Sequence, residues 1–96
     1  MLSGKDIIEI LNNKKEILFS KYSIQSMALF GSYARDENSS DSDVDIMVEF
    51  KDAIGFKFTD LADELEKTLN LKVDLVSKNG IKAKYFEYLK QDLKYV

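Results

Sequence analysis

Cysteine and histidine are both absent from this chain of 96 residues. Without cysteine there is no disulfide, no thiol nucleophile and no thiolate zinc site. Without histidine there is no imidazole to act as a base or a metal ligand. These two absences together exclude Ser-His-Asp triads, papain-like hydrolases and zinc enzymes.

A surplus of basic residues is also missing. The chain has 14 Lys and Arg residues against 17 Asp and Glu residues, so its net charge is −3 at pH 7 and its pI is near 4.9. Tight, sequence-independent binding to a phosphate backbone demands a basic face. We therefore expect no tight binding of nucleic acid.

Long apolar runs are missing too. The longest are only a few residues, whereas a membrane-spanning helix needs about 20, and the first residues contain no signal-peptide hydrophobic region. We expect a soluble, cytoplasmic protein with no membrane contact. A composition of 45% hydrophobic and 32% charged residues is typical of a globular protein. A chain of this length has enough apolar surface for one core, which predicts a single domain over 1–96.

Hydrophobic periodicity and turn residues predict an alternation of helices and strands. The expected elements are a helix over 4–20 with a capping box at its start, a strand over 24–30, a short helical turn at 33–35, a strand over 44–50, a helix over 58–69, a strand over 71–76 and a last helix over 81–93. This order predicts an α/β fold, with a small mixed three-stranded sheet flanked by about four helices. The stripes expected to face the core include Ile7, Ile10, Leu11, Ile17 and Leu18 in the first helix and Ile81, Tyr85, Tyr88, Leu89 and Leu93 in the last.

Two acidic residues stand one residue apart at the head of the strand over 44–50. The two-residue period of a strand puts Asp43 and Asp45 on one face, where their carboxylates repel each other unless a cation lies between them. Mg²⁺ suits such a pair, because it prefers oxygen ligands and usually keeps positions for water and substrate phosphates. Asp74 is a further lone carboxylate in the apolar strand over 71–76. The pattern therefore predicts a magnesium-bound nucleotide.

A Gly-Ser pair follows the strand over 24–30. A turn at this point can aim backbone N–H groups and the Ser32 hydroxyl at an anionic phosphate, and Gly31 has no side chain to obstruct the approach. Two other motifs fail at specific positions. An EF-hand loop that starts at Asp41 would need Gly where Ile46 stands and Glu where Asp52 stands, and a P-loop would need a second Gly followed by Lys.

Four segments of the sequence resemble one known family. They are FGSYAR at 30–35, SDVDIMVEF at 42–50, LADELE at 61–66 and KVDLV at 72–76. Together they resemble the minimal nucleotidyltransferases, the MntA-type antitoxins of the DNA polymerase β-like nucleotidyltransferase superfamily. The resemblance covers most of the chain and implies a nucleotidyltransferase-like fold.

The resemblance implies a role for each matching residue. The implied roles are triphosphate binding by Gly31 and Ser32, phosphate contact by Arg35, and binding of two catalytic Mg²⁺ ions by Asp43, Asp45 and Asp74. Asp74 would also help to activate the acceptor hydroxyl. The chain departs from the pattern at Asp36, where relatives commonly have Gly.

The resemblance also implies a reaction and a partner. AMP would pass from ATP to a hydroxyl, expected to be that of a tyrosine, on a HEPN-domain toxin encoded nearby, and the chain would act as the antitoxin. One alternative is a non-catalytic antitoxin that neutralises its partner by binding. Another is a stand-alone nucleotidyltransferase that acts on a small molecule or an RNA end. Assembly into a homo-oligomer or a hetero-oligomer is compatible with each hypothesis.

Overall fold

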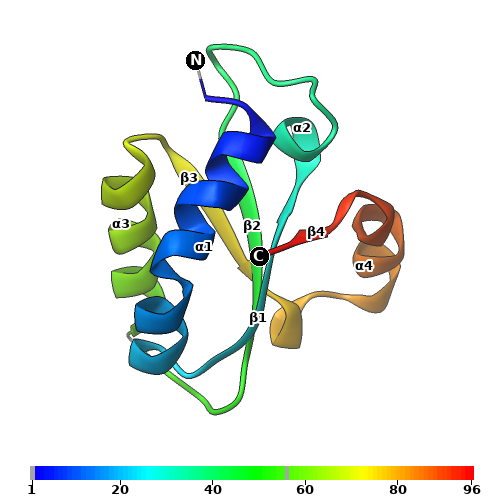
Figure 1. Cartoon of the computed structure of the whole chain (residues 1–96). Coiled ribbons are helices and arrows are strands. Elements are labelled where there is room, and N and C mark those ends of the chain that lie inside the picture. Colours follow the sequence, from blue (N-terminus) through cyan, green and yellow to red (C-terminus); the bar gives the residue numbers. More distant parts are fainter. Residues whose placement is uncertain (1, 56) are drawn as a thin grey trace.

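The computed structural model describes residues 2–55 and 57–96, and its helices and strands alternate along the chain (Figure 1). The elements are α1 (Gly4–Lys21), β1 (Ile24–Phe30), α2 (Gly31–Ala34), β2 (Val44–Phe50), α3 (Lys57–Leu69), β3 (Val73–Ser77), η1 (Lys78–Gly80), α4 (Ala83–Leu89), η2 (Lys90–Asp92) and β4 (Lys94–Tyr95). None of the helices in this part of the chain has the length and apolar character of a membrane-spanning segment.

The strands form one mixed sheet in the order β3-β2-β1-β4. β2 pairs in parallel with β3, whereas β1 pairs antiparallel with both β2 and β4. The predicted α/β class is confirmed, but the predicted count of three strands is wrong, because the described residues form four. The additional strand, β4, has only two residues, which is too short for an alternating pattern to reveal it.

Helix α1 begins where the sequence predicts. The Ser3 hydroxyl accepts a hydrogen bond from the Asp6 backbone N–H at 3.1 Å, and the Asp6 carboxylate accepts one from the Ser3 N–H at 2.9 Å. This capping box satisfies two N–H groups that a helix start would otherwise leave unpaired. The capping box therefore fixes the start of α1 at Gly4.

Helices α1 and α3 lie side by side over one face of the sheet and form the main core with it (Figure 1). The fully buried side chains of this core include Ile7, Leu11, Leu18, Ile24, Leu29, Val44, Ile46, Val48, Leu61 and Leu65. Ile17 was predicted to belong to this core, but its side chain is 62% exposed. Each residue of a helix is rotated about 100° from the last, so Ile17 points away from the sheet when its neighbour Leu18 points towards it.

The opposite face of the sheet carries a smaller core beneath α4. Phe30, Met47 and Leu89 are buried there, with Phe86 packed against them. Tyr85 and Tyr88 were predicted to face the core, but they are 50% and 72% exposed. In a helix of seven residues the stripe formed by Phe86 and Leu89 is enough to cover Met47, and the tyrosine hydroxyls stay in water.

Candidate active site

The register of β2 and β3 brings two acidic residues together. Asp45 and Asp74 are direct neighbours in the parallel ladder, so their side chains leave the sheet on the same face. This is the α4 face, because Val44 and Ile46 on either side of Asp45 belong to the main core under α1 and α3. Asp43 precedes β2 and is exposed, whereas Asp45 is only partly exposed. The site is therefore an acidic patch at one end of an otherwise apolar sheet.

Burial and the neighbouring carboxylates both affect the ionisation of Asp45. The pKa of Asp45 is raised from 3.8 to about 6, first because burial disfavours its charged form and then because Asp74 and Asp43 carry negative charge nearby. The positive charge of Arg35 opposes the shift. The positive charge near Asp45 is therefore too small to stabilise its ionised form at the usual pKa.

Gly31 packs directly on this acidic patch. Its backbone has φ +74°, a left-handed conformation that side chains rarely adopt, and a Cβ at this position would overlap the Asp45 Oδ2 atom. The overlap arises because Phe30, the residue before it, pairs with Asp45 in the β1–β2 ladder. Ser32 follows in the first turn of α2, and its carbonyl accepts a hydrogen bond from the Glu37 N–H at 2.9 Å. The Gly31 backbone thus lies against the Asp45 carboxylate.

Arg35 is held beside the site by two carboxylates. Its Nη1 atom lies 2.8 Å from Asp92 Oδ2, and its Nε atom lies 2.9 Å from Glu37 Oε1. These two bonds use two of the five N–H donors of the guanidinium, and its predicted contact with phosphates remains a prediction. No local pattern could have revealed Asp92, because 57 positions separate it from Arg35. Its side chain is only 19% exposed, so this ion pair ties η2 to the end of α2.

Asp36 occupies the position where the resemblance implies glycine, and its backbone has a conformation that glycine adopts readily. Its φ is +58°, in the left-handed region. Aspartate tolerates this conformation better than most residues with a Cβ, at a cost of about 1–2 kcal/mol. The turn closes normally, since the Asp36 N–H donates to the Tyr33 carbonyl at 3.4 Å. The departure from glycine therefore leaves the turn in place.

The acidic patch has the donor chemistry of a magnesium site without forming a complete one. Within the described residues, no group of three or more His, Cys, Asp or Glu side chains is arranged to hold a metal ion. Mg²⁺ commonly binds through one or two carboxylates and takes its other ligands from water and substrate phosphates. The raised pKa of Asp45 shows that a cation would relieve repulsion here. The residues fit an ion that arrives with a nucleotide, held by Asp45 together with Asp43 or Asp74.

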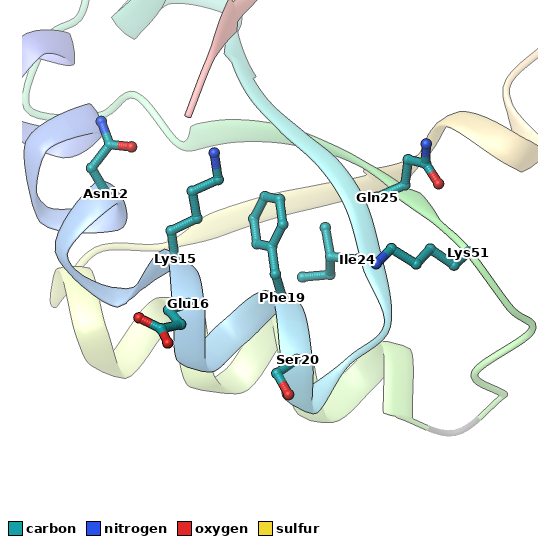
Figure 2. A pocket seen from close by; sticks show the side chains of 8 residues that line it. All are labelled: Asn12, Lys15, Glu16, Phe19, Ser20, Ile24, Gln25 and Lys51. Atoms are coloured by element: carbon teal, nitrogen blue, oxygen red, sulfur yellow. The ribbon is translucent and has the colours of Figure 1, made fainter.

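The patch is open to solvent, because Asp43 and Asp74 are exposed and Asp45 is partly exposed. A hollow of about 640 Å³ lies elsewhere, between α1 and the beginning of β1. Figure 2 shows Lys15, Phe19 and Lys51 among the side chains that line it. None of the predicted site residues belongs to this hollow. A nucleotide at Asp45 would therefore remain accessible from outside.

The raised pKa of Asp45 has a consequence for stability that pH can test. The pKa of Asp45 rises from 3.8 in the unfolded chain to about 6 in the folded protein. The folded protein therefore loses stability as pH rises through this window, because ionisation of Asp45 costs more in the folded state. In metal-free buffer, Asp45→Asn should melt at a higher temperature than the wild type at pH 8 and at a nearly equal temperature at pH 4. With partial solvent screening, the difference at pH 8 should be about 1–2 kcal/mol. Equal pH profiles for the two proteins would contradict the burial of this charge.

A mixed sheet with carboxylates on neighbouring strands and a glycine turn packed against them defines a nucleotide-transferring class of protein. Residues 11–95 match the family model of the nucleotidyltransferase domain. The chain therefore belongs to this family and is a nucleotidyltransferase, as the resemblance in the sequence implied.

The chain is similar to named relatives and to a solved structure of this family. The chain is 46% identical over 98 residues to MJ0128 of Methanocaldococcus jannaschii, a candidate protein adenylyltransferase, and the match covers all of both chains. It is 37% identical over 97 residues to the protein adenylyltransferase MntA of Thermococcus cleftensis, covering 100% of this chain and 98% of the relative. Its fold is similar to the structure of a tri-AMPylated Shewanella oneidensis HEPN toxin in complex with its MNT antitoxin. That likeness has a TM-score of 0.66 and 26% identity, and covers 91% of this chain and 69% of the other.

Proposed function

We propose that this chain transfers AMP from ATP to a tyrosine hydroxyl of a HEPN-domain toxin and thereby acts as the antitoxin. The observation that carries the proposal is the pairing of Asp45 with Asp74 beside the Gly31 turn. Support for the acceptor comes from the relatives, since one is named a protein adenylyltransferase and a similar structure contains an AMPylated HEPN toxin.

The proposed step forms one bond and breaks one bond. The acceptor oxygen attacks the α-phosphorus of ATP, the bond from that phosphorus to the pyrophosphate oxygen breaks, and pyrophosphate leaves. Asp74, the more exposed carboxylate, accepts a hydrogen bond from the acceptor hydroxyl, orients it and takes its proton. Gly31 and Ser32 hold the triphosphate, and Arg35 contacts it. Two Mg²⁺ ions held by the aspartates would neutralise the triphosphate charge in this site.

The acceptor has to be supplied by another molecule. The acidic patch lies at the end of an open sheet face, and α4 covers only the part of that face around Met47. A protein of net charge −3 is suited to meet a basic partner, because complementary charge speeds the encounter. A toxin that binds RNA is a partner of this kind.

Co-expression with the neighbouring gene product tests the proposal. We expect the partner to co-purify and its intact mass to increase by one or more AMP units, and peptide mapping should place the AMP on tyrosine. The Asp43→Asn variant should leave the partner unmodified, because it removes a charge needed to hold the ion. Asp41→Asn is the matched control, since Asp41 is also exposed in the same loop but does not belong to the patch.

The two alternatives predict different results in this experiment. If Asp43→Asn neutralises the toxin as well as the wild type and the partner gains no mass, the chain acts by binding alone. If AMP appears on RNA or a small molecule and never on the partner, the chain is a stand-alone enzyme. Either result would overturn the proposal.

A further inference from the structure

Strand β3 is an edge strand with one side open. The sheet order places β2 on one side of β3, and within the described residues no strand lies on the other. The Val44 N–H donates to the Lys72 carbonyl at 2.9 Å, so the main-chain groups of Lys72 face β2. The direction of these groups alternates from one residue of a strand to the next. The main-chain groups of Val73, Leu75 and Ser77 therefore face outward. The Val73 N–H donates to Glu66 Oε2 at 2.9 Å. The outward main-chain groups of Leu75 and Ser77 can therefore form hydrogen bonds with an added strand.

An apolar groove crosses this open edge. The hollow measures about 460 Å³, and Phe58 of α3 and Tyr85 of α4 both line it together with Leu75 and Val76 of the strand. Leu75 packs with the main core and Val76 with the core under α4, so the groove offers apolar contacts on both faces of the sheet. Tyr85, which lines the groove, is 50% exposed. An added strand has alternating side chains, which match a groove of this form.

The same edge strand carries Asp74. In a sheet, residues opposite each other on adjacent strands point to the same face, so a residue that pairs with Asp74 would face the side on which Asp45 lies. A long side chain there would direct its end towards the acidic patch. An apolar side chain at the next position of the added strand would lie opposite Leu75, within the groove.

We propose that the acceptor protein binds as an extended segment that adds a strand to the open edge of β3, with its tyrosine opposite Asp74. The main-chain groups of Leu75 and Ser77 provide the backbone hydrogen bonds, and the groove at Phe58 and Tyr85 receives the apolar residues next to the tyrosine. Strand addition thereby delivers the tyrosine hydroxyl to the carboxylates. This inference rests on the proposed function and names how its acceptor is recognised.

A short peptide can test this arrangement with the full chain. The probe is acetyl-Lys-Thr-Val-Tyr-Val-Thr-Lys-amide, whose palindromic sequence allows parallel or antiparallel pairing. With ATP and Mg²⁺, mass spectrometry should detect AMP on its tyrosine. Methylation of the backbone nitrogens of the tyrosine and both valines should raise the KM for the peptide about tenfold, because pairing in either direction then loses at least one main-chain hydrogen bond. An unchanged KM would contradict strand addition.

Two tyrosines of α4 provide a matched pair of variants. Tyr85→Ala should raise the KM for the peptide about fivefold to tenfold and leave the KM for ATP unchanged, because Tyr85 lines the groove but not the acidic patch. Tyr88→Ala should change neither constant, since Tyr88 is 72% exposed on the same helix and does not line the groove. Equal effects of the two variants would overturn the inference.

The natural partner separates failure of this inference from failure of the proposed function. If the wild type modifies the co-expressed toxin, and Tyr85→Ala and Phe58→Ala modify it at the wild-type rate, the function stands and the docking site is wrong. If the wild type transfers AMP to neither the toxin nor the peptide, the proposed function itself fails. A higher KM for the peptide in Tyr85→Ala, with an unchanged KM for ATP and an unchanged melting temperature, supports both.

Discussion

Replacing Asp45 with asparagine is expected to reduce AMP transfer by about 10²–10³-fold and to leave the fold intact. Asparagine keeps the shape of the side chain but removes a charge, and the loss of one preorganised electrostatic group in an active site typically has an effect of this size. Asp43→Asn should act in the same direction. The rate is measured by the mass increase of the acceptor, and circular dichroism checks the fold.

Asp74 allows the roles of the carboxylates to be separated. Asp74→Asn should abolish turnover but retain ATP binding, because Asp43 and Asp45 remain to hold the nucleotide's ion. Asp41→Asn serves as the control for loss of one negative charge. Wild-type turnover in both Asp43→Asn and Asp45→Asn would refute the assignment of the acidic patch as the active site. Loss of ATP binding and folding together in Asp74→Asn would make that residue structural.

Substitution of Gly31 by alanine is expected to damage both stability and activity. The left-handed backbone at φ +74° costs a residue with a Cβ about 1–2 kcal/mol. In addition, the new Cβ would overlap Asp45 Oδ2, so the turn or the carboxylate has to move. We expect a lower midpoint in urea unfolding and a transfer rate reduced by about 10²-fold, since small displacements of positioned groups are costly in catalysis.

Gly55 offers a close control for this substitution. It also has a positive φ, of +53°, but a Cβ there would meet no atom of the described residues within 4 Å. Gly55→Ala should therefore show the backbone cost alone, with transfer unchanged. If the two alanine variants lose the same stability and both keep full activity, the contact between Gly31 and Asp45 has no functional role.

Much of the candidate site could be predicted from local sequence. The period of two along DVDIMVEF put Asp43 and Asp45 on the face opposite Val44 and Ile46, and the main core confirms the position of these two apolar residues. The Gly-Ser pair at the end of an apolar strand predicted a turn, which begins at Gly31. Such patterns succeed because side-chain direction in a strand depends only on neighbouring residues.

The neighbours of each site residue depended on the tertiary structure. The distance along the chain from Asp45 to Asp74 gives no information on strand register, which results from packing of β3 against β2 under α3. Asp92 and Arg35 are separated by 57 positions, and only the return of the chain through α4 and β4 brings them together. Tyr85 and Tyr88 illustrate the same limit, since a seven-residue helix does not show which of its sides will face the sheet.

The sequence by itself thus determined α1 and α3, the three longer strands, the identity of the acidic residues and the family, whereas the last helix, predicted over 81–93, is helical as α4 only over Ala83–Leu89. It could do so because helix caps, hydrophobic periods and short motifs are local properties of the chain. Tertiary structure alone decided the fourth strand, the raised pKa of Asp45, the close contact of Gly31 with that carboxylate and the open edge of β3. Each of these depends on burial or on pairing between distant segments, and both arise only when the sheet is assembled.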